Sequence, residues 1–456
     1  MFPSMLILED LLVQHESKTL EFKRDVSSPE NIIRTVVAFS NGAGGTILIG
    51  VEDRTRSVRG IPDPTRTEEL LANLISDRIE PRLVPELQIL PWRKTCIIAL
   101  RVYPSSTRPH FVKAAGPEQG VYVRVGSTNR RADPAQIEEI KRFVRGITFD
   151  EEPLPGKNTE AIDFRAASEC FSTVRKLRKS DLRTLQITAI HQNHEVPTVG
   201  GFLLFGRDRR ATFPDAYIRA GCFSGIDKSD IIDSSEITGY LPLLVEDVLK
   251  FIKRNTRHAI HVEGTKHAEA WEFPPAALRE AVINALVHAD YAQRGAPLRV
   301  AIFDNRIEID NPGGLPLGLT LEEIHRGVSK LRNRVIGRVF HELGLIEQWG
   351  SGIQRMVGAC VQAGLPEPLF EEIGSGFRVT IYSQAQVQPL IDPIDRTVMD
   401  YIRKVKEAST SKVAAHIGRT PRTARTRLNH LVDLGLLVPI SSSPRDPRRV
   451  YRLAIK

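Results

Sequence analysis

The sequence predicts a multidomain protein of the α+β and α/β classes, on the basis of three observations. The chain has 456 residues, which at roughly 100–200 residues per domain suggests about three domains with separate cores. Strand-like apolar runs alternate with helical stretches along most of its length. Apolar residues make up 41% and charged residues 26%, a composition that excludes disordered, collagen-like and coiled-coil chains.

The same composition bears on the cellular compartment. No apolar run approaches the roughly 18 residues of a membrane-spanning helix, and the first residues lack the features of a signal peptide. The four cysteines, Cys96, Cys170, Cys222 and Cys360, form neither a CxxC pair nor a disulfide framework. We therefore expect a cytoplasmic protein in a reducing compartment.

The first domain is expected over residues 1–148. Its predicted elements are strands at 46–51, 96–102 and 121–125 and helices at 30–41, 68–79 and 135–144. Residues 150–157 are charged and rich in Pro and Gly, and we interpret them as a linker to the next domain.

Two further domains are expected before the C-terminal tail. A middle α/β region covers residues 158–265, with a predicted helix at 180–192 and a predicted strand at 201–206. The third domain covers residues 266–385. In it, Pro274-Pro275 opens a helix, and strands at 298–303 and 306–310 are joined by a tight turn.

The tail, residues 394–456, is strongly basic. From residue 395 onward it holds 14 basic and 5 acidic residues, whereas the other 394 residues hold 49 basic and 50 acidic. Three helices are predicted, at 395–406, from Ser409 or Thr410 to 417, and from Thr420 to 434, followed by a strand pair around a turn-rich loop. A basic segment on a neutral body is typical of a nucleic-acid-binding domain.

The order of these tail elements resembles a winged helix-turn-helix domain, with the third helix as the recognition helix and the loop as the wing. The resemblance implies that the helix contacts bases or phosphates and that the wing grips the DNA backbone. A solvated basic helix, or a domain used for protein contacts, is the alternative. The candidate nucleic-acid residues are Arg422, Arg425, Arg427, Arg445, Arg448 and Arg449.

The predicted helix over residues 278–291 carries three polar residues on one face. Glu280, Asn284 and His288 are spaced four apart, so a helix aligns them. A carboxylate and an amide inside an otherwise apolar helix need a partner, because burying them unpaired is costly. Hydrated Mg²⁺ with a phosphate suits both, since an amide oxygen can ligate the metal and a carboxylate can polarise water.

Two glycine-containing segments follow this helix. Asp310-Asn311-Pro312-Gly313-Gly314 places a polar turn at a strand end, and Gly350-Ser351-Gly352 stands just before another helix. Glycines there let backbone N–H groups approach a phosphate at a helix N-terminus. Each signal is weak when taken singly.

In this order the three segments resemble the N, G1 and G2 boxes of the GHKL ATPases. Residues 270–385 resemble most closely the divergent GHKL domain often called "RecG-related C-terminal", an α/β sandwich. The resemblance implies an ATP and Mg²⁺ site in which Glu280 activates water and Asn284 binds Mg²⁺. Asn311 would face the adenine at a position where the family has an aspartate, and the adjacent Asp310 is the candidate to replace that aspartate. The cofactor would also contact His288, Gly313, Gly314, Gly350 and Gly352. A relic that binds no nucleotide is the alternative, and no GxxxxGK[ST] loop indicates a helicase motor.

Two motifs in the first domain also resemble a known family. Glu16-Ser17-Lys18-Thr19-Leu20-Glu21-Phe22-Lys23 and the segment from Ala38 to Asp53 resemble the Schlafen AlbA-type domain. Some Schlafen domains are metal-dependent RNases with three carboxylates. Carried over, these would be Glu16, Glu21 and Asp53, holding Mg²⁺ or Mn²⁺ beside Lys23.

The competing interpretation makes Glu21 and Lys23 a structural ion pair in a domain that only binds nucleic acid. In that case basic side chains would contact the backbone of the nucleic acid. They are Lys18, Lys23, Arg24, Arg54, Arg56, Arg124, Arg130 and Arg131.

Together these features favour an ATP-binding, DNA-binding transcriptional regulator, acting as a homodimer or higher homo-oligomer. Closure of residues 313–352 over ATP would change the dimer geometry and so move two winged helices on a palindromic site. The rival hypothesis is a Schlafen-like metal-dependent nuclease for RNA or DNA that could act in phage defence, with the GHKL domain as its switch. The third hypothesis is an interaction scaffold whose sites are inactive.

Overall fold

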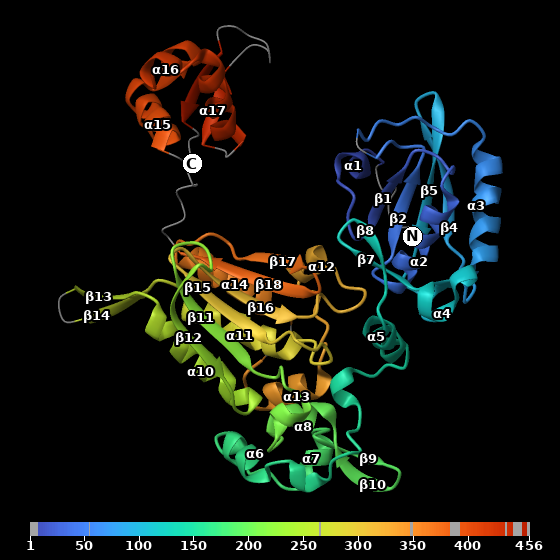
Figure 1. Cartoon of the computed structure of the whole chain (residues 1–456), viewed down its shortest axis with the longest axis vertical. Coiled ribbons are helices and arrows are strands. Elements are labelled where there is room, and N and C mark those ends of the chain that lie inside the picture. The colour runs from blue at the N-terminus through green and yellow to red at the C-terminus, as the bar shows by residue number, and fades with distance from the viewer. Residues whose placement is uncertain are drawn as a thin grey trace. The chain divides into compact units, whose positions relative to one another are not determined.

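The computed structural model describes residues 8–53, 55–263, 266–346, 350–383, 393–433, 436–440 and 449–453. The chain forms two compact units, Met1–Ser383 and Gln384–Lys456 (Figure 1). The predicted multidomain α/β architecture with mixed sheets is confirmed. Among the described helices, none is long and apolar enough to cross a membrane.

The N-terminal domain is built on a four-stranded sheet with the order β1-β2-β5-β4, in which β1 and β2 are parallel and the other pairs antiparallel. Helices α2 and α3 pack on it, and their apolar residues form one core with β2 and β5. The elements are α1 (Leu8–Val13), β1 (Leu20–Lys23), α2 (Pro29–Asn41), β2 (Gly45–Ile49), α3 (Pro64–Arg78), β3 (Ile79–Glu80), β4 (Glu86–Trp92), β5 (Thr95–Val102), β6 (Phe111–Val112), α4 (Gly116–Gln119), β7 (Tyr122–Val125), β8 (Thr128–Arg131) and α5 (Pro134–Val144).

The second large sheet has six strands in the order β12-β11-β15-β16-β18-β17. Helices α10, α11 and α14 cover one of its faces, and their apolar side chains join the inward side chains of β15 and β16 in one core (Figure 1). The elements are β11 (Ile218–Ser224), β12 (Asp230–Ile237), α10 (Leu241–Asn255), β13 (His258–Glu263), β14 (Lys266–Trp271), α11 (Pro275–His288), β15 (Leu298–Phe303), β16 (Arg306–Pro312), α12 (Leu321–His325), α13 (Arg334–Glu342), α14 (Gly352–Gln362), β17 (Leu369–Ile373) and β18 (Gly376–Tyr382).

This sheet crosses the domain boundary that the sequence predicts at residue 265. Strand β11 pairs in parallel with β15, from Ile218 against Leu298 to Cys222 against Ile302. Because β11 and β12 belong to the expected middle region and β15 to the expected third domain, separate cores for 158–265 and 266–385 are wrong. The apolar run of β11 is buried on joining this sheet, and sequence periodicity cannot reveal such a long-range pairing.

The elements between the two sheets differ from the sequence prediction in two places. They are α6 (Phe164–Phe171), α7 (Asp181–Thr184), β9 (Thr188–His191), β10 (His194–Pro197), α8 (Val199–Phe205) and α9 (Arg209–Thr212). The predicted helix at 180–192 ends at Thr184 and is followed by a hairpin. The predicted strand at 201–206 is a buried helix, capped by the Thr198 side chain, which accepts a hydrogen bond from the Gly201 N–H at 2.9 Å. A short apolar run fits a buried strand or a buried helix equally well.

The segment predicted as a linker is packed rather than free. Asp150 is fully buried, and its two carboxylate oxygens accept hydrogen bonds from the backbone N–H groups of Arg334 and Ile336, each at 3.0 Å. These donors belong to the first turn of α13, which has no partners for them within the helix. The composition of residues 150–157 indicated a linker, but this carboxylate ties the N-terminal domain to α13.

The C-terminal unit contains the predicted three helices and strand pair. They are α15 (Pro393–Val405), β19 (Glu407–Ser409), α16 (Thr410–His416), α17 (Pro421–Asp433), β20 (Leu437–Ile440) and β21 (Val450–Leu453). Strand β19, which the sequence did not indicate, completes a sheet with the order β19-β21-β20. The unit has its own core, which includes Val398, Ile402, Leu428 and Tyr451.

Candidate functional site

Helix α11 presents the three predicted polar residues to one cavity. Pro275 occupies the first turn, where its missing N–H costs nothing, and the apolar residues of the helix are buried against α10, α14 and the sheet. Glu280, Asn284 and His288 interrupt this apolar helix at four-residue intervals, and all three line the cavity.

Strand β16 brings Asn311 to the same cavity and turns Asp310 away from it. Successive side chains of a strand point to opposite faces, so Asn311 follows Ile307 and Ile309 toward the helices. Asp310 lies with Glu308 on the other face, where it accepts two hydrogen bonds from Arg378, at 2.6 and 2.9 Å. The hypothesis that Asp310 substitutes for Asn311 is therefore wrong for this arrangement.

The two glycine segments close the cavity from different sides. Gly314 lines it directly, whereas Gly313, with a φ of 89°, forms the turn that precedes it. Gly350 and Gly352 also line it, and Gly352 is the first residue of α14. A Cβ atom on Gly352 would stand 2.0 Å from Glu280 Oε1, so a side chain there would force the Glu280 carboxylate to move.

The cavity has an empty volume of about 1020 Å³, which includes the solvent at its mouth. Its apolar walls come from the helices, from β17 and β18 and from the segment between β16 and α13. They include Leu315, Leu319, Ile324, Val328, Met356, Phe370, Phe377 and Val379. A few polar groups set among apolar walls suit a ligand with an uncharged ring and a charged group.

Glu280 is held by two neighbours. Asn284 Nδ2 donates to Glu280 Oε1 at 3.1 Å, and Arg355 of α14 donates to Glu280 Oε2 at 3.0 Å. Because the amide nitrogen of Asn284 is used on Glu280, its oxygen is the atom left to meet a cation. Together with the close approach of Gly352 to Glu280, this donor set fits Mg²⁺ bound with a phosphate.

The positive charge at the site comes from residues that the sequence analysis missed. Lys330 and Arg355 both line the cavity. Burial lowers the pKa of His288 to about 4, so this imidazole is neutral at pH 7 and contributes no charge toward a phosphate. Neither Lys330 nor Arg355 belongs to a glycine or helix motif, so only the folded structure identifies them.

In the N-terminal domain, the acidic cluster is arranged differently. Glu21 on β1 is buried, and its two carboxylate oxygens pair with Lys23 and with Arg124, which is also buried. Glu16 accepts a hydrogen bond from the Phe22 N–H at 2.8 Å. Burial raises the pKa of Glu16, and the nearby carboxylates of Glu21 and Asp53 add to this effect. The Glu21–Lys23 ion pair is the structural alternative that the sequence analysis left open.

A metal site at these carboxylates finds no geometric counterpart. Within the described ranges, no group of three or more His, Cys, Asp or Glu side chains is arranged to hold a metal ion. The three residues Glu16, Glu21 and Asp53 are near one another, but protein cations already occupy Glu21.

Several basic residues of this domain are engaged within the protein. Arg124 is buried and so cannot contact a nucleic acid, which makes that expectation wrong. Lys18 pairs with Glu372 of β17 at 2.9 Å, and Arg56 donates to the Val13 carbonyl at 2.7 Å. Arg54 lies outside the described residues.

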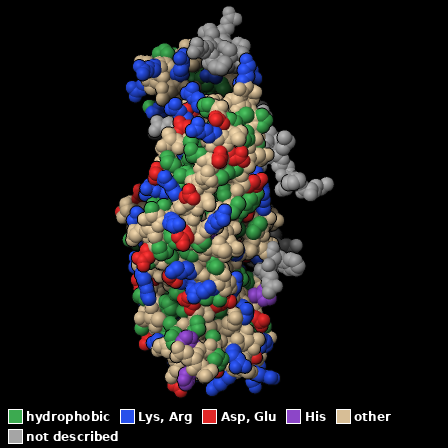
Figure 2. Space-filling model, turned by 90° about the vertical axis from the view of Figure 1, so that its right-hand side faces the viewer, with side chains coloured by type: hydrophobic (Ala, Val, Ile, Leu, Met, Phe, Trp, Pro, Cys, Tyr) green, Lys and Arg blue, Asp and Glu red, His purple; other side chains and the backbone are tan. Residues whose placement is uncertain are grey.

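The arginines of the C-terminal unit fall into two groups. Arg422 and Arg425 are exposed on α17. Arg427 is half-buried and pairs with the buried Asp395 at 3.2 Å, where His430 also contacts Asp395. Arg449 is half-buried beside Tyr451, whereas Arg445 and Arg448 lie outside the described residues. Figure 2 shows one face of the molecule, where Lys and Arg side chains are mixed with Asp and Glu.

Two family models match the chain. Residues 16–133 match the family described as "Schlafen, AlbA_2", and residues 295–381 match the family described as "Putative ATP-dependent DNA helicase recG C-terminal". No curated protein shows significant similarity to the chain.

Solved structures from two bacteria are also similar. The DIP2311 protein from Corynebacterium diphtheriae is 19% identical with a TM-score of 0.45, and the match covers 98% of this chain and 96% of that one. The N-terminal domain of a putative ATP-dependent DNA helicase RecG-related protein from Nitrosomonas europaea is 25% identical with a TM-score of 0.22. That match covers 28% of this chain and 94% of the domain.

The match to the RecG-related family begins after α11 and contains Asn311, Gly314, Gly350 and Gly352. Glu280 and Asn284 lie on α11, before the match, and line the same cavity. The first match contains both motifs of the N-terminal domain. The chain thus combines a Schlafen AlbA_2 domain with a domain of the RecG-related C-terminal type.

Proposed function

We propose that this chain binds ATP with Mg²⁺ in the cavity beside α11 and binds DNA through its C-terminal unit, as a nucleotide-responsive transcriptional regulator. One observation carries the nucleotide proposal. Residues from three separate segments, Glu280 and Asn284, Asn311 and Gly314, and Gly350 and Gly352, line the same cavity of about 1020 Å³.

Each group has a role suited to its chemistry. The Asn284 amide oxygen would ligate Mg²⁺, and the Glu280 carboxylate would polarise a water molecule near the terminal phosphate. The Asn311 amide would hydrogen-bond the adenine against the apolar walls. The backbone N–H groups at the start of α14 would meet the phosphates, with Lys330 and Arg355 supplying positive charge.

The C-terminal unit is proposed to be a winged helix. Its order of helix, strand, two helices and two strands supports this assignment, with α17 as the recognition helix and the β20–β21 loop as the wing. Arg422 and Arg425 are exposed on α17 and would contact bases or phosphates. Closure of residues 313–352 over the nucleotide in a homodimer would then set the spacing of two such helices on a palindrome.

Isothermal titration of the full chain with ATP, ADP and GTP, in the presence of Mg²⁺, tests the nucleotide site. We expect ATP binding by the wild type and a loss of at least tenfold in affinity for Asn284→Ala. Asn31→Ala, an exposed asparagine on α2, is the matched control and should bind as the wild type does. Failure of the wild type to bind any of the three nucleotides would refute the proposal.

A metal-dependent nuclease at Glu16, Glu21 and Asp53 is the second candidate. The closeness of the three carboxylates favours it, since burial raises the pKa of Glu16 and the charges of Glu21 and Asp53 add to this effect. The pairing of Glu21 with Lys23 and Arg124 supports instead a domain that binds nucleic acid without cutting it. Labelled RNA, single-stranded DNA and duplex DNA, incubated with Mn²⁺ or Mg²⁺ with and without ATP, distinguish the two.

A further inference from the structure

Two consecutive residues at the rim of the cavity, Gly314 and Leu315, are each tied to the N-terminal domain through one intermediate side chain. Both residues line the cavity. The two ties start from different parts of the N-terminal domain, one from helix α5 and the other from the segment before β1.

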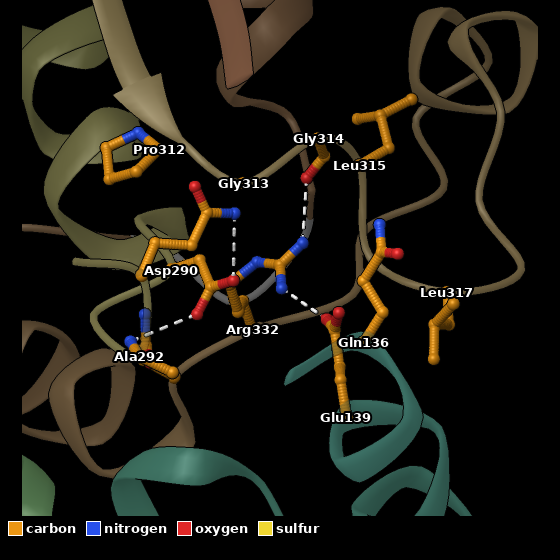
Figure 3. A network of polar contacts seen from close by, with 12 residues as sticks. Gln136, Glu139, Asp290, Ala292, Pro312, Gly313, Gly314, Leu315, Leu317 and Arg332 are labelled. Carbon is orange, nitrogen blue, oxygen red and sulfur yellow. Dashed lines mark hydrogen bonds and ion pairs between the residues drawn. The ribbon is translucent and has the colours of Figure 1, made fainter. Parts of the chain in front are cut away.

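The first tie passes through Arg332. Its guanidinium donates to the Gly314 carbonyl oxygen at 2.8 Å and forms an ion pair with Glu139 of α5 (Figure 3). The Arg332 side chain is only 10% exposed, so water weakens this pair less than it would on the surface. A guanidinium is planar and has fixed donor directions, so it holds the carbonyl and the carboxylate in one geometry.

The second tie passes through Glu372 of β17. Lys18 donates to both oxygens of Glu372, at 2.9 and 3.0 Å, and Glu372 Oε1 also accepts from the Leu315 N–H at 2.9 Å. A Cβ atom on Gly314 would stand 2.7 Å from Glu372 Oε1, so the rim packs directly against this carboxylate.

A third contact joins Lys330, which lines the cavity, to helix α5 of the N-terminal domain. Lys330 donates to the Leu317 carbonyl at 2.8 Å, and its ammonium lies 4.0 Å from the ring centre of Phe143 on α5. Arg108 of the N-terminal domain lies over the same ring at 4.4 Å. Three residues that line the cavity, Gly314, Leu315 and Lys330, are thus in contact with the N-terminal domain, the first two through Arg332 and Glu372.

We propose that Glu139 and Lys18 are positioning residues for the nucleotide cavity, acting through Arg332 and Glu372, so that the N-terminal domain sets the affinity for nucleotide. This inference rests on the proposed nucleotide site. By thermodynamic linkage, a ligand of the N-terminal domain that changed the affinity for nucleotide would have its own affinity changed by nucleotide by the same factor.

A purely structural interface would hold the two domains together without acting on the cavity. Here both ties end on backbone atoms of the rim, an N–H of Leu315 and a C=O of Gly314. Loss of either tie should therefore let the rim move before the protein unfolds.

The test measures the dissociation constant of the non-hydrolysable analogue AMP-PNP with Mg²⁺ by titration calorimetry on the full chain. Glu139→Ala and Lys18→Met should each change this constant by about fivefold or more, the lower end of typical coupling between sites. Glu138→Ala removes an exposed carboxylate from the same helix, and Lys18→Arg keeps the ion pair with Glu372. Both controls should stay within about twofold of the wild type.

The outcomes separate the two proposals. Binding by the wild type with unchanged constants in Glu139→Ala and Lys18→Met overturns the positioning role and leaves the nucleotide site in place. No binding by the wild type overturns the nucleotide site and this inference with it. A melting temperature measured for each variant checks that it is folded, and recovery of affinity in Lys18→Arg is a response that general destabilisation would not give.

Discussion

The cavity beside α11 and the acidic cluster on β1 both contain the polar residues that their motifs predict, but their surroundings differ. In the cavity, Glu280, Asn284 and Asn311 border about 1020 Å³ of empty space. In the cluster, Glu21 is buried against Arg124 and Lys23. Glu280 is also paired with a protein cation, Arg355, so pairing alone does not separate the two sites. The difference is that Glu280 and Arg355 line a cavity, whereas Glu21 and Arg124 are buried. An intact motif alone does not tell these two situations apart.

The largest effect expected from this contrast is on stability. Glu21→Ala leaves the buried Arg124 without its carboxylate, and breaking a buried pair in this way typically costs about 3–5 kcal/mol. Denaturant unfolding of this variant measures the loss, with Glu138→Ala as the exposed control. A folded, fully stable Glu21→Ala protein that had lost a metal-dependent cleavage activity would reverse the comparison in favour of the nuclease.

A substitution on the cavity side should act on the ligand and not on the fold. The Cβ of Gly352→Ala would meet Glu280 Oε1 at 2.0 Å, at the proposed phosphate end of the site. We expect AMP-PNP affinity to fall by about 100-fold, or about 2.7 kcal/mol. Gly358→Ala, on the same helix with nothing within 4 Å of the added carbon, is the matched control. Equal affinities for the two variants would remove this region from the site.

Asp150 is buried as Glu21 is, and the pH dependence of its contribution to stability sharpens the comparison. Burial raises the pKa of Asp150 to about 6, above the value of about 3.9 in an unfolded chain, so the folded state holds the proton more tightly. The stabilisation that the proton provides is present below about pH 4 and lost as pH rises to about 6. The difference is about 3 kcal/mol at 1.36 kcal/mol per unit.

Unfolding free energies measured from pH 4 to pH 7, for the wild type and for Asp150→Asn, check this expectation. The variant has no carboxyl to titrate, so its stability should depend less on pH over that interval. Parallel curves for the two proteins would show that Asp150 does not titrate in this range. It would then be fully ionised on the N–H groups of α13 and resemble the satisfied Glu21.

The smallest effect concerns the arginines of α17. Arg422 and Arg425 are exposed, whereas Arg427 is engaged with the buried Asp395. Arg422→Ala together with Arg425→Ala should weaken duplex DNA binding about tenfold and reduce the slope of log affinity against log salt by about 2. Fluorescence anisotropy at several salt concentrations measures both quantities.

Arg165→Ala, an exposed arginine of α6 in the other unit, provides the control for loss of one charge. Arg427→Ala should act on the stability of the C-terminal unit through Asp395. If Arg427→Ala instead altered the salt slope while the double variant did not, the exposed and the engaged arginines would have exchanged roles.

Local patterns determined much of this protein. Helix α11 with Glu280 and Asn284 on one face, the pair β15–β16 and the three helices of the tail follow from periodicity, caps and turns. The candidates Asn311 and Gly352 followed from the resemblance of their segments to a known family. These features depend on residues a few positions apart, so a sequence contains them directly.

The tertiary structure decided what depends on residues far apart in the chain. It placed β11 beside β15, made a helix of the apolar run 199–205, buried Asp150 under α13 and turned Asp310 away from the cavity. It also brought Lys330 to the cavity beside α11 and Arg124 to Glu21. Whether a charged side chain faces space or a partner depends on packing between distant segments, and no local spacing specifies that.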